Sequence, residues 1–410
     1  MNKRKIFNDP VYGFISIPFE IIYDIIEHPY FQRLRRINQL GLSSLVYPGA
    51  NHSRFQHTLG AVHLMGKALE VLRNKGHQIT NEEAEAVTIA ILLHDIGHGP
   101  YSHTLEQSIV NEVHHEQISL YFFEELNKTL NGRLSLAIKI FKNEYPKRFL
   151  NQLVSGQLDV DRLDYLIRDS FYTGVAEGVI GYDRIIQMLD VHDDNLVVEE
   201  KGIYSIEKFI VSRRLMYWQV YLHKTSLSAE HMMVNLLERA KFLARENGVK
   251  LPCSEPLRHF LEKEITLKDF ASNDIHLKTF ALLDDHDIMG AIKSWAVNDD
   301  ILLSYLSKGL LNRRLFKIEY GTEKEILELQ KLKNKLLSLK SSLLNDFHKY
   351  LIIKSKSINN AYNPTKDNIY IKYRNGNIKD ISEIADMLNI KSLSNPIEKH
   401  YLCYSADLIG

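Results

Sequence analysis

The sequence predicts a mainly α-helical protein with one small β-hairpin and an appended C-terminal α+β region. Two observations support this prediction: apolar residues recur at helical spacing over long stretches, and segments that favour strands are few and short. The clearest helix spans residues 82–95. There Ala84, Val87, Ile91 and His94 follow at spacings of three, four and three, so they share one face that we expect to point inward.

Two further long helices are expected, over residues 209–243 and 323–352. Residues 196–198 and 203–205 flank a charged turn and are expected to pair as the hairpin. Short strands in the C-terminal half are expected at residues 315–320, 368–373 and 400–404. Together these strands predict a small mixed α+β subdomain.

A junction is expected where Pro252 and Pro256 interrupt the helical pattern. We therefore predict a helical domain over residues 1–250 and a C-terminal α+β region over residues 251–410, with a possible oligomerisation or regulatory role. A chain of 410 residues, 45% of them hydrophobic, is long enough to form two such units around a sizeable core.

The charge balance argues against a general polyanion-binding protein. Lys plus Arg and Asp plus Glu both total 51, so nucleic acid or anionic lipid would have to be bound at a local site. Cys253 and Cys403 are too far apart for a CxxC metal motif and suggest no disulfide framework. The first residues lack the apolar segment of a signal peptide, and no apolar run reaches membrane-spanning length. We expect a cytoplasmic protein without a membrane or nucleic-acid partner.

Histidines are concentrated in one part of the chain. Nine of the eighteen lie between His52 and His115, which favours a single functional centre. His-Asp dipeptides occur at residues 94–95, 192–193 and 286–287. The second and third lie in Asp-rich segments for which we expect solvated turns.

His94 and Asp95 differ from the other two pairs because they end an apolar helical run. Buried imidazole and carboxylate groups need a partner, and both are good ligands for a divalent metal, which offsets the cost of burying charge. One helix cannot complete such a site. His57 and Asp161 are the candidates for the missing ligands.

Four motifs together resemble those of the HD-domain deoxynucleoside triphosphate triphosphohydrolases, especially the SAM-and-HD-domain dNTPases and their bacterial relatives. The motifs are RFQH from Arg54, HDIGHGP from His94, HHEQ from His114 and DVDRLDY from Asp159. The resemblance covers roughly residues 5–245 and implies an HD-domain helical core.

The resemblance implies that the catalytic metal is bound by His57, His94, Asp95 and Asp161. The metal would be a divalent transition metal such as Fe, Mn, Zn, Ni or Co, with Mg a further candidate at the substrate phosphates. The implied reaction is attack of water on the α-phosphorus of a deoxynucleoside triphosphate, which releases a deoxynucleoside and inorganic triphosphate.

A general acid is needed to protonate the departing 5′ oxygen, and His103 is the candidate. Glu106, one turn further along the same predicted helix, could orient the His103 ring, although a surface ion pair explains that spacing equally well. His115 matches a second active-site histidine of the family.

The resemblance also assigns substrate-binding residues. Arg54, Arg162 and Arg213 match positions that bind the triphosphate, where planar guanidinium groups suit phosphate oxygens. Tyr165 matches the residue that excludes a 2′ hydroxyl. The remaining residues assigned to the nucleoside pocket are Gln39, Leu40, Asp169, Tyr217 and Tyr221, of which Tyr217 stands where the animal enzyme has a histidine.

A second, allosteric nucleotide site is implied near the amino terminus, between subunits of a homo-oligomeric tetramer or dimer. The matching residues are Lys5, Asn8, Glu27, Gln32 and Arg35, with Arg184 at an adjoining position. Glu199 and Glu200 stand where basic residues would meet the activator's phosphates, and carboxylates there would repel a triphosphate. We therefore expect a guanine nucleotide activator that binds weakly or in another pose.

Two alternatives remain open. The chain could be an HD-superfamily phosphatase acting on another nucleotide, or a nucleotide-sensing protein with little turnover. Suitable residues fill all four metal-ligand positions and His103, which favours the enzyme.

Overall fold

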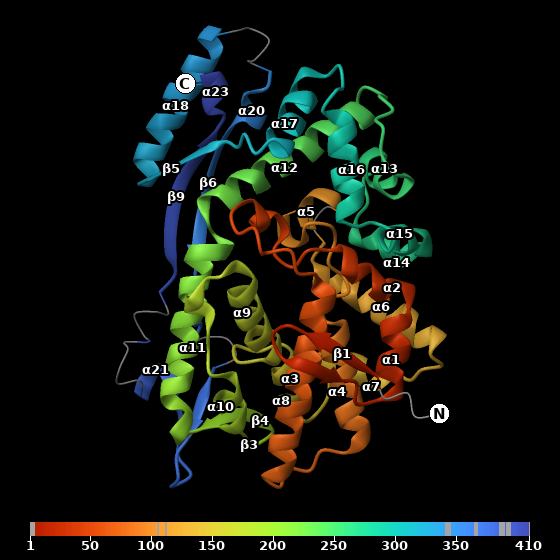
Figure 1. Ribbon diagram of the computed structural model, residues 1–410, viewed down its shortest axis with the longest axis vertical. Coiled ribbons are helices and arrows are strands. Elements are labelled where there is room, and N and C mark those ends of the chain that lie inside the picture. The colour runs from red at the N-terminus through yellow and green to blue at the C-terminus, as the bar shows by residue number, and fades with distance from the viewer. Residues whose placement is uncertain are drawn as a thin grey trace.

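The computed structural model describes most of the chain and confirms a mainly helical fold (Figure 1). The described residues are 5–104, 106–110, 113–340, 346–364, 368–384, 390 and 395–409, apart from the side chains of His103, Gln107, Lys340 and Ile409. No helix among them is long and apolar enough to cross a lipid bilayer.

The amino-terminal part begins with a two-stranded hairpin and two short helices. Strands β1 (Ile6–Asp9) and β2 (Gly13–Ser16) pair antiparallel, and α1 (Glu20–Glu27) and α2 (Pro29–Gln32) follow. Helix α1 is buried along most of its length because apolar side chains fill its inward face.

The central bundle is built around α3 (Arg54–Asn74), which packs against α4 (Asn81–Leu93) and α9 (Val160–Thr173). The helix predicted over residues 82–95 is confirmed as α4. Its burial is not confined to one face, since almost every residue from Ala84 to Leu93 is buried. The other helices of this part are α5 (Glu106–Ile109), α6 (His115–Thr129), α7 (Ser135–Phe141), α8 (Arg148–Val154) and α10 (Tyr182–Gln187).

The predicted hairpin exists, but the sequence prediction of its strands was partly wrong. Strand β4 (Asn195–Glu199) pairs antiparallel with β3 (Leu189–His192), whereas residues 203–205 begin helix α11 (Ile203–Met216). The turn between β3 and β4 is made by Asp193 and Asp194, both with positive φ, as a tight hairpin turn requires. The second His-Asp dipeptide therefore lies in an exposed turn, as expected.

The long helix predicted over residues 209–243 is two helices. A π-helical turn at Tyr217–Tyr221 separates α11 from α12 (Lys224–Arg245), and His223 caps α12 by accepting a hydrogen bond from the Thr225 amide. This interruption redirects the chain, so that α12 runs diagonally above α9 in Figure 1.

The C-terminal region is α+β, as predicted. Five helices follow α12, namely α13 (Glu255–Glu262), α14 (Leu267–Ser272), α15 (Asp274–Phe280), α16 (Asp285–Trp295) and α17 (Ile301–Leu311). Of these, α13 and α17 pack against α12, and α15 packs against α6. The helix predicted over residues 323–352 corresponds to α18 (Glu323–Lys340) and α20 (His348–Leu351), with residues 341–345 outside the described part. The short α21 (Ile381–Ile384) and α23 (Ala406–Ile409) complete the helices described here.

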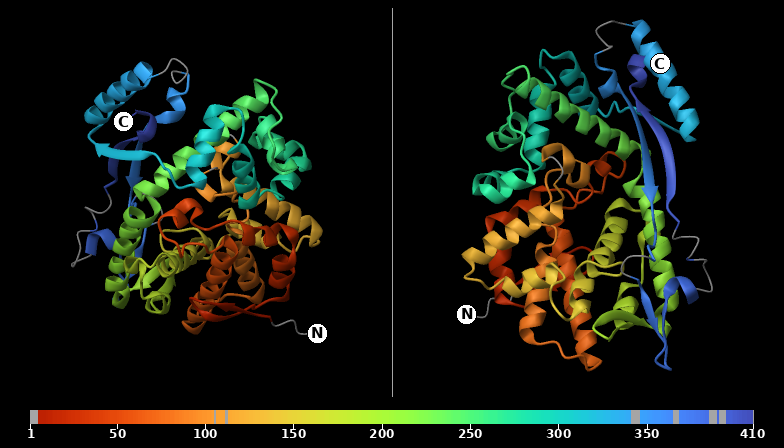
Figure 2. Two further views of the ribbon diagram at one scale, coloured as in Figure 1. Left: turned by 45° about the horizontal axis from the view of Figure 1, so that its top comes forward. Right: turned by 180° about the vertical axis from the view of Figure 1, so that it is seen from behind.

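Two sheets place C-terminal strands against the rest of the molecule. Strands β5 (Lys317–Gly321), β9 (Ile397–Tyr404) and β6 (Ile352–Asn359) form an antiparallel sheet in that order, and β6 and β9 extend along α11 (Figure 2). Strands β7 (Tyr370–Lys372) and β8 (Ile378–Asp380) join the β3–β4 hairpin, with β7 parallel to β4. The C-terminal region thus shares a sheet with the preceding domain.

A solvated turn was expected at the third His-Asp dipeptide: His286 is exposed, but both residues belong to the first turn of helix α16, so the prediction of a turn was wrong. Asp284 caps α16 by accepting a hydrogen bond from the His286 amide, and both Asp284 and Asp285 are buried.

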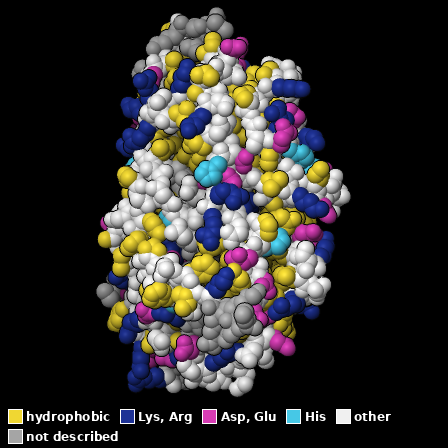
Figure 3. Space-filling view, turned by 45° about the vertical axis from the view of Figure 1, so that its right-hand side comes forward, with side chains coloured by type: hydrophobic (Ala, Val, Ile, Leu, Met, Phe, Trp, Pro, Cys, Tyr) yellow, Lys and Arg dark blue, Asp and Glu magenta, His cyan; other side chains and the backbone are white. Residues whose placement is uncertain are grey.

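On the face of the molecule in Figure 3, basic and acidic side chains are interspersed, in keeping with equal numbers of each in the sequence.

Candidate active site

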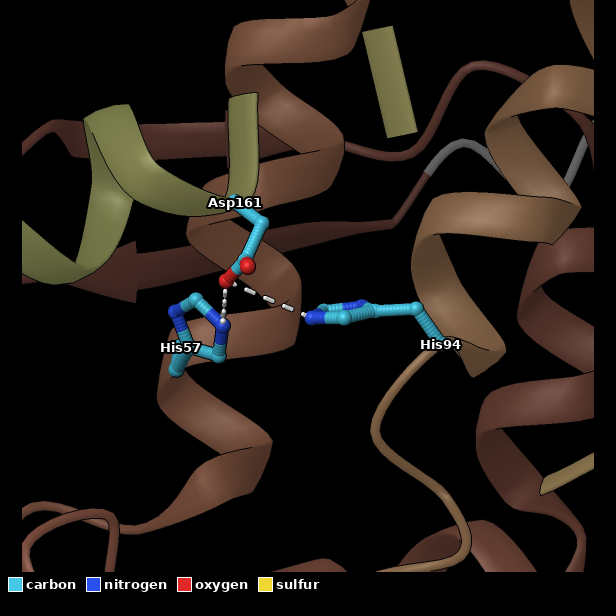
Figure 4. A group of neighbouring side chains, drawn as sticks. All are labelled: His57, His94 and Asp161. Carbon is cyan, nitrogen blue, oxygen red and sulfur yellow. Dashed lines mark ion pairs between the residues drawn. The ribbon is translucent and has the colours of Figure 1, made fainter. Parts of the chain in front are cut away.

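Three helices bring His57, His94 and Asp161 together (Figure 4). The Nε2 atom of His57 lies 3.0 Å from Oδ1 of Asp161, and Nε2 of His94 lies 3.4 Å from the same oxygen. Both histidines are buried, while the Asp161 side chain keeps 28% of its surface exposed. Three of the four predicted ligands therefore meet at a point that is open on one side.

Local sequence fixes each of these side chains near a helix end. Gln56 accepts a hydrogen bond from the amide of Ser53 (2.8 Å), which sets the start of α3 just before His57. Asp159 caps α9 by accepting from the Arg162 amide, which places Asp161 in the first helical turn. His94 follows the last turn of α4.

Two glycines allow the close packing that this arrangement needs. A Cβ atom at Gly60 of α3 would lie 1.9 Å from a carboxylate oxygen of Asp164 on α9. A Cβ atom at Gly97 would lie 2.1 Å from the carbonyl oxygen of His115. Any larger residue would force α9 or α6 away from the site.

Hydrogen bonds to the opposite ring nitrogens aim both histidines at the common point. Asp164 Oδ2 lies 2.8 Å from Nδ1 of His57, and the carbonyl of Ile91 lies 2.6 Å from Nδ1 of His94. Among the described residues, neither Nε2 atom has a hydrogen-bond partner, although both are buried. Metal-binding histidines are held in this way, so the donor set fits a divalent cation.

The electrostatics agree with that fit. Burial lowers the pKa of His57, but the carboxylates of Asp161 and Asp164 beside its two ring nitrogens outweigh it and raise the pKa to about 10. Burial raises the pKa of Asp161, whereas the adjacent His57 and His94 rings bring it well below the usual range. The cluster therefore attracts positive charge, which a proton or a metal ion can supply.

Asp95, the fourth predicted ligand, faces both this cluster and a neighbouring one. Its carboxylate oxygens lie 3.2 Å from Nε2 of His94 and 3.7 Å from Nε2 of His57, and Oδ2 accepts from the Arg54 guanidinium. Asp95, His98 and His115 form a second group with metal-ligand spacing. The two imidazole rings of that group stack with centroids 3.8 Å apart.

The predicted acid pair is arranged differently from the expectation. Ser102–Thr104 is a short 3₁₀ turn and Glu106 starts a separate helix, so His103 and Glu106 do not share one helix. Glu106 Oε1 accepts from the His115 amide (2.6 Å) and lies 2.8 Å from its Nδ1 atom. The His103 side chain lies outside the described residues.

A cavity of about 510 Å³ lies next to the His/Asp clusters. It is lined by Asp161, Asp95 and His115 and by all nine residues predicted to bind substrate, namely Gln39, Leu40, Arg54, Arg162, Tyr165, Asp169, Arg213, Tyr217 and Tyr221. They come from the loop after α2, from the start of α3, from α9 and α11 and from the π-helical turn. The fold thus brings together residues that are up to 182 positions apart in the sequence, Gln39 and Tyr221 being the outermost.

The three arginines are held by short contacts at the cavity wall. The Nε atom of Arg54 donates to Ser102 (2.8 Å), Nε of Arg162 donates to Asp159 (3.1 Å), and Nη1 of Arg213 donates to the Ala361 carbonyl (3.2 Å). Each guanidinium has more donors than these contacts use, and the remaining donors suit an anionic ligand.

Beside Tyr165, the cavity is lined by Asp169, Tyr221 and Gln39 rather than by arginines. Tyr221 donates a hydrogen bond to Asp169 Oδ2 (2.8 Å), and Asp169 Oδ1 lies 2.7 Å from Nε2 of His52. The Tyr165 and Tyr221 rings meet edge to face with centroids 6.0 Å apart. The buried Oε1 atom of Gln39 has no hydrogen-bond partner among the described residues, so it can accept one from a ligand.

Several lining residues were not among the predictions, chiefly Glu230, His98 and Tyr101. His98 lies within the HDIGHGP motif and could have been chosen for its position next to His94 and Asp95. Glu230 sits on α12 without any motif around it, and burial raises its pKa to about 7. No local pattern could have indicated it.

The predicted allosteric residues lie apart from this cavity. Lys5 donates to the hydroxyl of Tyr23, Gln32 donates to the Ile26 carbonyl (2.7 Å), and Arg35 donates to Oε1 of Gln32 (2.8 Å). The remaining two, Asn8 in β1 and Glu27 in α1, belong to the same amino-terminal part. Arg184, on α10, donates to the Lys201 carbonyl (3.1 Å).

Comparison with known proteins supports the motif assignment. Residues 54–169 match the HD domain, and residues 180–247 match the HD associated region. An uncharacterized protein of Bacillus subtilis, YwfO, is 32% identical over the whole of this chain and 94% of its own length. The chain belongs to the HD-domain family.

Two further relatives of this HD-domain phosphohydrolase add to the comparison. The solved structure of a phosphohydrolase from Bacteroides thetaiotaomicron has 55% sequence identity and a TM-score of 0.91, and the match covers 98% of this chain and 100% of that one. A protein of Dictyostelium discoideum named deoxynucleoside triphosphate triphosphohydrolase SAMHD1 homolog is 32% identical over 58% of this chain and 49% of its own length.

Proposed function

We propose that this HD-domain phosphohydrolase hydrolyses deoxynucleoside triphosphates to a deoxynucleoside and inorganic triphosphate. The observation that carries the proposal is one cavity that is lined by all nine predicted substrate-binding residues and by Asp95 and Asp161 of the four predicted metal ligands. The related Dictyostelium protein, named for the same activity, supports the choice of substrate.

His57, His94 and Asp161, with Asp95 beside them, would hold the metal. A divalent cation there supplies Lewis acidity, which lowers the pKa of water and offsets phosphate charge. Arg54, bonded to Asp95 and lining the same wall, would place the α-phosphate against this group.

The other phosphates would be bound by Arg162 and Arg213, whose guanidinium groups match phosphate oxygens in shape and charge. Arg162 comes from α9, two turns before Asp169, and Arg213 comes from α11. A triphosphate would therefore be bound from two sides, and the nucleoside would extend toward Gln39 and Tyr221.

The leaving 5′ oxygen needs a proton, and His103 and His115 are the candidate donors. The main chain of His103 lies in the turn next to Ser102, which lines the cavity. His115 lines the cavity directly, and Glu106 orients its ring through Nδ1. A ring that is oriented in this way can present its other nitrogen to the leaving oxygen, as a general acid must.

Selection of deoxyribose would depend on Tyr165. Asp169 and Tyr221 form a hydrogen-bonded pair that could bind the 3′ hydroxyl, and the Tyr165 ring beside Tyr221 would crowd a 2′ hydroxyl. A ribonucleotide displaced by that ring would lose contacts with the pocket and would be hydrolysed less efficiently.

The test is to incubate the protein with each deoxynucleoside triphosphate and a series of divalent metals, and to separate the products by chromatography. We expect the nucleoside and intact triphosphate. Nucleoside monophosphate or diphosphate as the only nucleotide product would support a phosphatase of another specificity. Tight binding without any product would support a nucleotide sensor.

A further inference from the structure

The segment Leu283–Asp285 leads into α16 and contacts residues of the amino-terminal half of the chain. It lies beyond the two family-matched regions, the second of which ends at residue 247. The Asp285 side chain is buried. Its Oδ2 atom accepts a hydrogen bond from the Asn38 amide (2.9 Å), and its Oδ1 atom accepts one from the Tyr101 amide (2.8 Å). One carboxylate therefore joins two loops that are 63 residues apart in the sequence.

Both loops form part of the cavity wall. Asn38 immediately precedes Gln39 and Leu40, and Tyr101 immediately precedes Ser102. Ser102 connects the loops a second time, because its hydroxyl donates to the Asn38 carbonyl (3.1 Å) and accepts from Nε of Arg54 (2.8 Å). The position of Arg54 is thus tied to the same two loops.

The conformation of the second loop requires support. Tyr101 and Ser102 have φ values of 54° and 55°, in the left-handed region that residues with a side chain rarely adopt. Such a backbone persists where surrounding contacts hold it. The bond from the Tyr101 amide to Asp285 is one such contact, and the bonds of Ser102 are others.

The segment is itself firmly attached to the HD domain. The carbonyl of Leu283 accepts from Nη1 of buried Arg33 (3.2 Å), while Nη2 of Arg33 donates to the Ile96 carbonyl (2.7 Å) in the HDIGHGP motif. Asp284 pairs with Arg36. Burial raises the pKa of Asp285 to about 6, and the two amide bonds oppose that rise, so the carboxylate is ionised above this pH.

We propose that Asp285 is a positioning residue for the substrate cavity, which holds the Gln39 loop and the Ser102 turn at the spacing that lets Gln39 and Arg54 contact one substrate. The inference rests on the proposed function for the identity of that substrate. Asp285 does not touch the substrate, since it acts through the Asn38 and Tyr101 amides. The C-terminal region thereby supports a cavity to which it contributes no lining residue, since the lining residues run from Gln39 to Glu230.

The test compares Asp285→Asn with Asp300→Asn. The first change keeps the size of the side chain but replaces one of its two acceptors with a donor, so one loop amide loses its partner. Asp300 is the matched control, because it caps α17, pairs with Arg239 (2.5 Å) and does not line the cavity. Thermal midpoint, bound metal, kcat and KM for dATP are measured for both variants and the wild type.

For Asp285→Asn we expect KM to rise and kcat/KM to fall roughly 10- to 100-fold, with metal content unchanged, because small misplacement of binding groups has effects of this size. Asp300→Asn should lower the thermal midpoint while KM stays within about twofold of the wild type. Equal kcat/KM losses in the two variants, or loss of metal from Asp285→Asn, would overturn the positioning role.

Two additions keep the test decisive. Asp285→Ser, with a smaller side chain and one hydroxyl, serves if the Asn variant does not fold, and the same comparison with Asp300→Asn applies. Binding of inorganic triphosphate, measured by calorimetry, needs no turnover. If the wild type hydrolyses no deoxynucleotide, the proposed function fails. If the wild type binds triphosphate and both Asp285 variants bind it equally well, the positioning role fails instead.

Discussion

The substrate cavity and the amino-terminal region were both predicted from the same resemblance, yet their polar side chains are used differently. In the His/Asp cluster beside the cavity, the Nε2 atoms of His57 and His94 are buried, and so is Oε1 of Gln39 in the cavity itself; none of the three has a hydrogen-bond partner among the described residues. In the amino-terminal region, Gln32 bonds to Arg35 and to the Ile26 carbonyl.

This difference indicates where a ligand is needed. Buried polar atoms without partners are costly, and a ligand that pairs with them removes that cost. Side chains already bonded within the fold gain less from a ligand, because they would have to exchange one partner for another. We therefore expect large functional effects from changes in the cavity and small ones from changes near the amino terminus.

The largest effect is expected from His57→Ala, His94→Ala, Asp161→Ala and Asp95→Ala. Each should abolish detectable hydrolysis and lower the bound metal, since even outer-shell changes at metal sites cost roughly 10- to 100-fold. His192→Ala, at the end of strand β3, is the control for loss of a histidine. A variant that keeps full activity and wild-type metal content would remove its residue from the set of ligands.

The next effect concerns the general acid. His103→Ala should keep the metal and lose about 10²- to 10⁴-fold in rate, the usual contribution of a positioned acid. Glu106→Ala should cost less, because it acts by orienting His115. If His103→Ala retains the wild-type rate while His115→Ala does not, the proton comes from His115.

A smaller effect on specificity is expected from Tyr165→Ala. Removing the ring should raise kcat/KM for ribonucleotides relative to deoxynucleotides by roughly 10- to 200-fold, the range that a small steric difference in a pocket is worth. Tyr182→Ala, outside the cavity lining, is a suitable control. Unchanged discrimination in Tyr165→Ala would place the sugar-selecting residue elsewhere.

The smallest effect is expected at the amino terminus. Arg35 lies over the ring of Phe55, with its guanidinium 3.6 Å from the ring centre, so Arg35→Ala should cost about 0.5–1 kcal/mol of stability. Hydrolysis of one deoxynucleotide is measured with and without dGTP or GTP, together with the mass in solution. An oligomer whose strong guanine activation disappears in Arg35→Ala would break the contrast between the two regions.

The sequence was most informative where motifs are short and local. His94 and Asp95 stand at the end of an apolar run, and Asp161 stands two residues after the capping residue Asp159. Both placements depend on only a few neighbouring residues. The nine residues predicted to bind substrate could be assigned only through the resemblance, since they come from five separate segments.

What the sequence could not predict depends on distant partners. Residues 203–205 have strand-forming side chains, but packing of α11 overrides that local preference. Asp285 stands in an Asp-rich segment typical of a turn, and its burial follows from contacts with Asn38 and Tyr101, both more than 180 positions away. Such contacts leave no periodic pattern.

We propose that water attacks the α-phosphorus of a deoxynucleoside triphosphate at the centre formed by His57, His94 and Asp161. The decisive measurement is hydrolysis in ¹⁸O-labelled water, followed by mass spectrometry of both products. We expect one ¹⁸O atom in the released inorganic triphosphate and none in the deoxynucleoside. Label in the nucleoside, or in orthophosphate or pyrophosphate released beside a shortened nucleotide, would contradict it.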